Sequence, residues 1–201
     1  NFSFIIFCIS KRSDQFSFKN NNNLMIIKQF KFKLVGSTNN VAINLIKYKK
    51  LKVGAILAER QNKGRGQRGK KWISYKGNFF ASFFYSLEKI NLSLQQLTLI
   101  NAKLTKKIIS RYYRNNVKIK LPNDILINEK KICGILQETI EMNGVKFLIV
   151  GIGLNLIKSP NISSYPTTNL YELTKKKISA NSVFHEFLFI YKNFLKNKRI
   201  K

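Results

Sequence analysis

Apolar and polar residues alternate along the chain in two rhythms, one typical of strands and one typical of helices. Residues 29–35 (QFKFKLV) place an apolar side chain at every second position, the pattern of a strand with one buried face. The apolar run 53–59 predicts a short buried strand, and 78–87 predicts another. Residues 117–121 (VKIKL) form a strand that ends at Pro122.

Helical spacing occurs three times along the chain. A first helix is predicted after 29–35, because Ser37 or Thr38 is a good N-cap and the apolar residues behind it share one side. A second covers 94–114, where Ser93 opens a capping box ahead of four apolar residues at helical spacing. A third is predicted over 182–197, which carries six apolar residues on its core side.

Turn signals between the later strands predict hairpins. Glu129 and Lys130 separate DILIN from KICGILQETIEM, and Asn143-Gly144 separates the second segment from VKFLIVGIGLNL. Strands joined by tight turns run antiparallel. We therefore predict an α+β fold, with a mixed, largely antiparallel sheet and helices packed on it.

The length of the chain suits one domain. Its 201 residues are 44% hydrophobic, enough for one packed core, and no apolar run reaches the roughly 18 residues of a membrane span. We assign this domain to residues 29–201 and a tail to residues 1–28. The first ten residues have no basic leader, and an asparagine run precedes Met25. We interpret Met25 as the natural start, so that the residues before it are upstream sequence or a disordered tail.

The formal net charge of +28 suggests a polyanionic partner such as a nucleic acid. However, only 7 of the 37 cations are arginine, and the lysines are scattered over every segment. We therefore interpret the overall charge mainly as a compositional bias. A basic nucleic-acid-binding module stays open as an alternative function of another class.

Cysteine and histidine are scarce. Cys8 and Cys133 provide neither a disulfide framework nor a metal-ligand spacing, which fits a reducing cytoplasm. The one histidine, His185, lies on a predicted amphipathic helix, so catalysis by Ser-His or Cys-His pairs is not expected.

The candidate chemistry begins at residues 62–72 (NKGRGQRGKKW), a glycine loop between two predicted strands. Its glycines match dinucleotide-binding and phosphate-loop patterns, but both need a helix after the loop, and KKWISYKGN has no helical periodicity. What remains is a flexible loop whose backbone N–H groups and cations suit phosphate or carboxylate. Those cations are Lys63, Arg65, Arg68, Lys70 and Lys71.

Together with four further motifs, this loop resembles biotin protein ligases, in order and in spacing, from about residue 30 to residue 197. The five motifs are GSTN (36–39), GRGxxGxxW (64–72), KLPND (120–124), KKICGIL (130–136) and GIGLN (151–155). The resemblance implies a biotin/lipoate ligase-like catalytic domain. It further implies an ATP-dependent ligase that forms biotinyl-5′-AMP and transfers biotin to one lysine of a carboxylase carrier.

This resemblance also implies the substrates and partners. Biotin and ATP are substrates, with Mg²⁺ assisting, and the acceptor is the biotin carboxyl carrier domain of acetyl-CoA carboxylase. It leaves a homodimer open, and it implies neither DNA nor a membrane as partner. Because a carboxylate must meet a triphosphate, the main tasks are positioning and charge neutralisation, without a covalent nucleophile.

The site residues follow from matching the motifs. Arg65, Lys131 and Asp124 are the implied catalytic residues, with Asp124 assisting the acceptor amine, and no metal ligands are assigned. The implied biotin contacts are Ser37, Thr38, Asn39, Gln61, Gly64, Arg65, Arg68 and Gly134. The implied nucleotide contacts are Arg68, Lys70, Trp72, Asn123, Lys131 and Asn155.

Two departures from the family pattern change the expectations. The family loop usually reads GRGR, whereas this chain has Gln67 at the fourth place, so we expect looser retention of the adenylate. The chain shows neither an N-terminal winged helix-turn-helix nor the C-terminal β-barrel of bacterial members, so we expect a minimal or truncated form without repressor activity. A lipoate ligase is the nearest alternative, and GRGxxGxxW with KLPND favours biotin.

Overall fold

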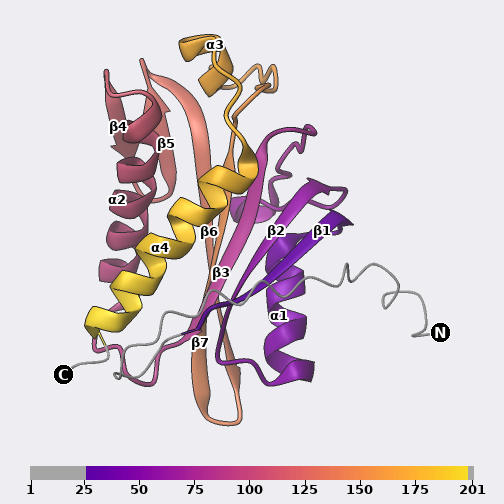
Figure 1. Cartoon of the computed structure of the whole chain (residues 1–201), viewed down its shortest axis with the longest axis vertical. Helices are drawn as coiled ribbons and strands as arrows, with labels where there is room; N and C mark the ends of the chain where they lie inside the picture. The colour runs from indigo at the N-terminus through magenta and orange to yellow at the C-terminus, as the bar shows by residue number, and fades with distance from the viewer. Residues whose placement is uncertain (1–25, 199–201) are drawn as a thin grey trace.

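The computed structural model describes residues 26–198, which form one seven-stranded sheet with helices on both of its faces (Figure 1). Only the first pair of strands is parallel, and the other five pairs run antiparallel, which confirms the predicted mixed sheet. In spatial order the strands are β1 (Lys28–Val35), β2 (Val53–Gln61), β3 (Phe79–Ser86), β7 (Val145–Leu154), β6 (Lys130–Met142), β5 (Asp124–Ile127) and β4 (Val117–Lys120).

The parallel pair is the one feature of the sheet that hairpin signals do not predict. Helix α1 (Thr38–Lys49) connects β1 to β2, and a helical crossover brings the second strand back in the same direction. In this parallel pair the last residues of β1 lie beside the last residues of β2. Helix α1 begins just after the end of β1, so its first residues lie there too. This arrangement positions the GSTN motif beside Gln61.

The central strand β3 is buried on both faces, because its sequence is apolar at nearly every position. Phe79, Phe83 and Tyr85 pack under α2 (Leu94–Tyr112) and α4 (Ala180–Lys198), and the Phe83 ring stacks on Tyr191 at 4.5 Å between centroids. On the opposite face, Phe84 belongs to a smaller core under α1. The larger helices therefore fill one face and leave room beside α1 on the other.

The predicted helices occur with small changes at their ends. The predicted capping box of α2 is present, with both the Ser93 and the Gln96 bonds made, and α4 begins two residues before its predicted start. A five-residue helix, α3 (Leu170–Thr174), was not predicted; Asn169 caps it by accepting from the Glu172 N–H at 2.8 Å. One turn is too short to show any periodicity in the sequence.

Strand β6 is much longer than its neighbour β5. The β5 pairing ends at Gly134, after which β6 continues along β7 alone and forms the long hairpin seen in Figure 1. Within this hairpin Gly134 lies opposite Gly153. Two adjacent glycines therefore leave a bare patch of backbone in the middle of the sheet.

Residues 1–25 lie outside the described part of the chain, so the tail and the start at Met25 stay predictions. The boundary at residue 28 also stays a prediction, although β1 begins at Lys28. None of the helices in the described part has the length and apolar character needed to cross a membrane.

Candidate active site

A cavity of about 420 Å³ opens on the face of the sheet that carries α1, between the loop 62–72 and the turn 120–124. Most of the predicted site residues line it, although they come from four separate segments of the chain. Those residues are Ser37, Thr38, Asn39, Gln61, Arg65, Arg68, Lys70, Trp72, Asn123, Asp124, Lys131 and Gly134. Two predicted residues, Gly64 and Asn155, do not line it.

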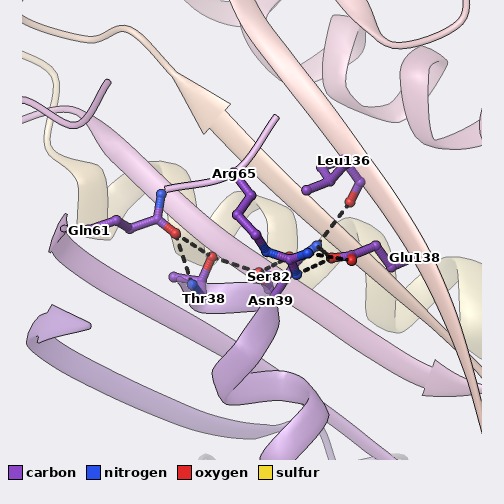
Figure 2. A network of polar contacts seen from close by, with 7 residues as sticks. All are labelled: Thr38, Asn39, Gln61, Arg65, Ser82, Leu136 and Glu138. Carbon is purple, nitrogen blue, oxygen red and sulfur yellow. Dashed lines mark hydrogen bonds and ion pairs between the residues drawn. The ribbon is translucent and has the colours of Figure 1, made fainter. Parts of the chain in front are cut away.

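One wall of the cavity is a chain of neutral hydrogen-bonding groups (Figure 2). Gln61 Oε1 accepts from the Thr38 N–H at 2.8 Å and lies 3.2 Å from the Thr38 hydroxyl. The Ser82 hydroxyl lies 2.5 Å from Asn39 Oδ1 and 2.7 Å from Thr38 Oγ1. Because Asn39 Oδ1 can only accept, Ser82 donates to it, and Thr38 donates its one proton either to Ser82 or to Gln61.

Ser37 differs from an ordinary helix cap. It occupies the N-cap position of α1 with extended backbone angles, yet its side chain makes no capping hydrogen bond. The residue is only 3% exposed and lines the cavity. A buried hydroxyl that does not serve its own helix is available to a ligand.

Asn39 links this wall to a carboxylate that the sequence did not reveal. Asn39 Nδ2 donates to Glu138 Oε2 at 2.7 Å, and Arg65 forms a two-pronged pair with the same carboxylate at 2.8 and 2.6 Å. The glycine at position 151 permits this arrangement, because a Cβ there would lie 2.4 Å from Asn39 Oδ1. Figure 2 shows Arg65 reaching from the loop to Glu138 on β6.

The basic loop is folded back on itself by backbone hydrogen bonds. The Gly66 N–H donates to Lys70 O at 2.6 Å, and the Trp72 N–H donates to Gly64 O at 3.0 Å. Between them, Arg68 and Gly69 both have positive φ, at 53° and 74°. This left-handed pair reverses the chain direction within three residues and places Arg68 and Lys70 on the cavity.

Trp72 lies on the bare glycine patch of the sheet. A Cβ at Gly134 would come within 2.7 Å of the indole ring, and one at Gly153 within 2.4 Å. The indole therefore needs both glycines in order to sit where it does. Its Nε1 is buried without a hydrogen-bond partner among the described residues, so a donor is unused at the cavity.

Lys131 is held at the cavity by a carboxylate and two aromatic rings. Its Nζ lies 2.8 Å from Asp124 Oδ1, and both side chains are largely buried. The geometry is that of an ion pair and not of an aligned hydrogen bond, since Oδ1 has no hydrogen-bond donor. The ammonium also lies 5.7 Å from the Trp72 ring centroid and 5.2 Å from that of Tyr165, within range of cation–π attraction.

The backbone of Lys131 is held as firmly as its side chain. Its N–H donates to Pro166 O at 2.9 Å, and the Thr168 N–H donates to Lys131 O at 3.0 Å. This short ladder also places Tyr165 beside the ammonium. Tyr165 was missed by sequence reasoning, because its segment has no regular pattern.

Asn155 supports this segment instead of lining the cavity. Its Nδ2 donates to Thr168 O at 3.1 Å, its Oδ1 lies 3.4 Å from Asn78 Nδ2, and the residue is 2% exposed. Asn78 Oδ1 in turn accepts from three consecutive backbone N–H groups, those of residues 156–158, at 2.9 to 3.1 Å. The predicted contact of Asn155 with a nucleotide therefore stays a prediction, and Asn78 is a second organising residue of this region.

The electrostatics of the cavity favour anions. Its lining contains six cationic side chains and, within the described part of the chain, the one carboxylate of Asp124. The cations are Arg65, Arg68, Lys70, Lys71, Lys120 and Lys131. Behind this surface, burial raises the pKa of the Cys133 thiol well above its ordinary value, and the nearby Asp124 charge raises it further. Cys133 is therefore a packed apolar residue at neutral pH and no nucleophile.

Fold and site together identify the class of protein. Residues 31–155 match the model of the Biotin/lipoate A/B protein ligase family, and the chain belongs to that family. It is 32% identical over 126 residues to the bifunctional ligase/repressor BirA of Escherichia coli, a match that covers 61% of this chain and 39% of BirA. It is 34% identical over 109 residues to the biotin–[acetyl-CoA-carboxylase] ligase of Paracoccus denitrificans, covering 53% of this chain and 45% of that protein.

A solved structure has the same fold. Biotin protein ligase from Aquifex aeolicus, in complex with biotin and ATP, superposes with a TM-score of 0.71 at 30% identity. The superposition covers 87% of this chain and 73% of the Aquifex chain. The matched stretches thus span less than half the length of these two curated relatives and about three quarters of the Aquifex chain.

Proposed function

We propose that this chain is the catalytic domain of a biotin protein ligase, which activates biotin with ATP and transfers it to a lysine of a biotin carboxyl carrier domain. One observation supports this most directly. The same cavity combines a wall of neutral hydrogen-bonding groups with a cluster of cations. The neutral ureido ring of biotin matches the neutral wall, and the biotin carboxylate and the ATP triphosphate match the cations.

The neutral wall would bind the ureido ring. Ser37, Thr38 and Gln61 offer hydroxyl and amide groups without charge, and an unpaired charge buried there would be costly. Asn39 and Ser82 hold Thr38 in place from beneath. Gly64 contributes by its backbone, because its carbonyl fixes Trp72, and Gly134 leaves space for Trp72 beside the acid tail.

The cations would bring two anions together. A biotin carboxylate oxygen attacks the α-phosphorus of ATP, the bond to the departing pyrophosphate breaks, and biotinyl-5′-AMP forms. Lys131 would neutralise the carboxylate and the α-phosphate, whereas Arg68 and Lys70 would bind the outer phosphates. Trp72 and Asn123 line the same cavity and would contact the nucleotide.

Mg²⁺ would enter with the triphosphate. The cavity offers one carboxylate, Asp124, and Mg²⁺ is commonly held by one or two carboxylates together with phosphates and water. When bound, the ion would neutralise phosphate charge and orient the pyrophosphate.

Asp124 would serve the second step. The acceptor lysine must lose a proton before its nitrogen attacks the acyl carbon and AMP leaves. Asp124 is the carboxylate that lines the cavity, and it would accept a hydrogen bond from the amine.

A labelling assay tests the proposal. The chain is incubated with ATP, Mg²⁺, biotin and a carrier domain, and a parallel reaction contains lipoate in place of biotin. We expect one labelled carrier lysine, and only with biotin and ATP. Labelling with lipoate alone would make the protein a lipoate ligase. Tight salt-dependent DNA binding without pyrophosphate release would instead identify a nucleic-acid-binding module.

A further inference from the structure

Arg65 and Glu138 join the basic loop to strand β6 (Figure 2). The two oxygens of Glu138 accept from the two terminal nitrogens of Arg65 at 2.8 and 2.6 Å, the parallel geometry that gives Arg–carboxylate pairs their strength. Sequence matching assigns Arg65 to the anions of the substrates. In the structure, its guanidinium is already occupied by a carboxylate of the protein.

Glu138 is also oriented by a residue other than Arg65. Asn39 Nδ2 donates to Glu138 Oε2 at 2.7 Å, and Asn39 itself is 2% exposed and held by Ser82. The carboxylate therefore receives three donors and is a quarter exposed. A preoriented and partly buried acceptor loses little side-chain entropy when the pair forms, unlike an ion pair at the surface.

The cavity does not need the charge of Arg65 to bind anions. Arg68, Lys70 and Lys131 also line it, and neither Arg68 nor Lys70 has an ion-pair partner within the described part of the chain. If Arg65 bound a phosphate, it would first have to give up two charge-assisted hydrogen bonds. Such contacts contribute more than neutral ones, so losing them would offset much of what a phosphate contact gains.

We propose that Arg65 is a positioning residue that acts through Glu138. The pair fastens the loop 62–72 to β6, and thereby holds Arg68 and Lys70 at the cavity. The loop's own bonds, from Gly66 N–H to Lys70 O and from Trp72 N–H to Gly64 O, flank residue 65 and depend on its position. The inference rests on the proposed function for the identity of the ligand, whereas the fastening itself belongs to the chain without ligand.

Hydrogen exchange tests the fastening directly. Exchange of the peptide 62–72 is followed by mass spectrometry in the wild type, Arg65→Glu, Glu138→Gln, Glu138→Arg and the reversed pair Arg65→Glu/Glu138→Arg. We expect each single variant to exchange roughly tenfold faster in this peptide. The reversed pair should regain most of the lost protection, because it restores the attraction between loop and strand.

The control is a second ion pair at the other end of β2. Lys52 and Glu88 are 3.0 Å apart and exposed, so Lys52→Glu and Glu88→Lys make the same changes of charge without touching the loop. These variants should leave exchange of 62–72 unchanged. The amides of α2 report whether each variant is folded, and Glu138→Gln, which keeps the shape of the side chain, serves if the reversed charges disturb the fold.

Three outcomes would overturn the inference: single variants that exchange like the wild type, a reversed pair as open as Arg65→Glu alone, or control variants that open the loop equally. If Arg65 is an anion ligand instead, Arg65→Glu would weaken pyrophosphate binding, Glu138→Gln would not, and 62–72 would stay protected in both. Failure of the wild type to bind biotin would overturn the proposed function and leave this test intact, since it is run without ligand.

Discussion

Gly134 and Gly153 illustrate how single residues shape this site through what they lack. Both face the Trp72 ring, and neither has a positive φ. The site therefore uses the space that the missing side chains leave, and not the backbone freedom of glycine. Asp124 illustrates the opposite case, a side chain with two roles. It pairs with Lys131 through Oδ1 and is also the carboxylate that lines the cavity.

Gly153→Ala should displace Trp72. The new Cβ would lie 2.4 Å from the indole, which is closer than any real contact, so the ring must move away from the sheet. Trp72 is the only tryptophan of the chain, so its emission spectrum reports this directly. We expect a red shift and a weaker response to ATP. Gly36→Ala is the control, because its Cβ would meet nothing nearer than 3.8 Å; an unshifted spectrum in Gly153→Ala would contradict the packing.

Asp124→Asn should separate the two half-reactions. The amide cannot take a proton from the acceptor amine, whereas Lys131 remains free to neutralise the carboxylate and the α-phosphate. We expect transfer to the carrier to fall by roughly 100-fold or more, with a much smaller change in adenylate formation. Pyrophosphate exchange measures the first step, and single-turnover labelling of the carrier from preformed adenylate measures the second. Equal losses in both steps would argue against the assigned role.

Helix α2 shows how a single element links the core to the neighbourhood of the site. Asn101, on its buried side, donates to Gln137 Oε1 of β6 at 2.6 Å and accepts from the Tyr191 hydroxyl of α4 at 2.8 Å. Thr98, one turn earlier, accepts from Gln137 Nε2 at 2.9 Å. Gln137 is the neighbour of Glu138, so the packing of two helices fixes the strand that carries the fastening carboxylate.

Ser93→Ala should destabilise the protein through α2. The hydroxyl accepts from the Gln96 N–H at 3.2 Å, and the Gln96 side chain returns a bond to the Ser93 N–H at 2.8 Å. Removing the cap should lower the free energy of unfolding by about 1 kcal/mol. Urea denaturation followed by circular dichroism measures the change. Ser179→Ala removes a comparable bond at the start of α4, where the Ser179 hydroxyl accepts from the Asn181 N–H at 3.2 Å, and should cost a similar amount.

At the scale of the whole molecule, basic residues greatly outnumber acidic ones. The chain has 37 lysine and arginine residues and 9 acids, and two of the five ion pairs among the described residues lie at the site. Such scarcity means that a carboxylate at the cavity is seldom incidental. The abundant lysines also surround the site with potential acceptors for any activated acyl group that escapes.

Gln67→Arg should reduce that escape. Gln67 lines the cavity from the tip of the loop, and an arginine there would add a forked donor for the phosphate of the adenylate. We expect roughly tenfold slower release of biotinyl-5′-AMP and less biotin on the chain's own lysines when no carrier is present. Peptide mapping after incubation with ATP and biotin measures this labelling. Equal self-labelling by both proteins would show that Gln67 does not control retention.

Local signals in the sequence determined most of the elements of this protein. Period-two and helical spacings, the capping box at Ser93 and the Asn143-Gly144 turn act over a few residues, so they predicted the strands, the long helices and the hairpins. The five motifs likewise determined which family the chain belongs to and most of the cavity lining. Their residue types are the ones that the proposed chemistry needs.

Only the tertiary structure decided how those residues are paired. The parallel β1–β2 contact, the fork between Arg65 and Glu138, and the place of Tyr165 beside Lys131 each join segments that are far apart in the chain. The same holds for Asn155, whose side chain supports a loop because Asn78 and Thr168 arrive beside it. Such partners meet through packing of the whole sheet, and no spacing along a single sequence encodes which distant group a side chain will meet.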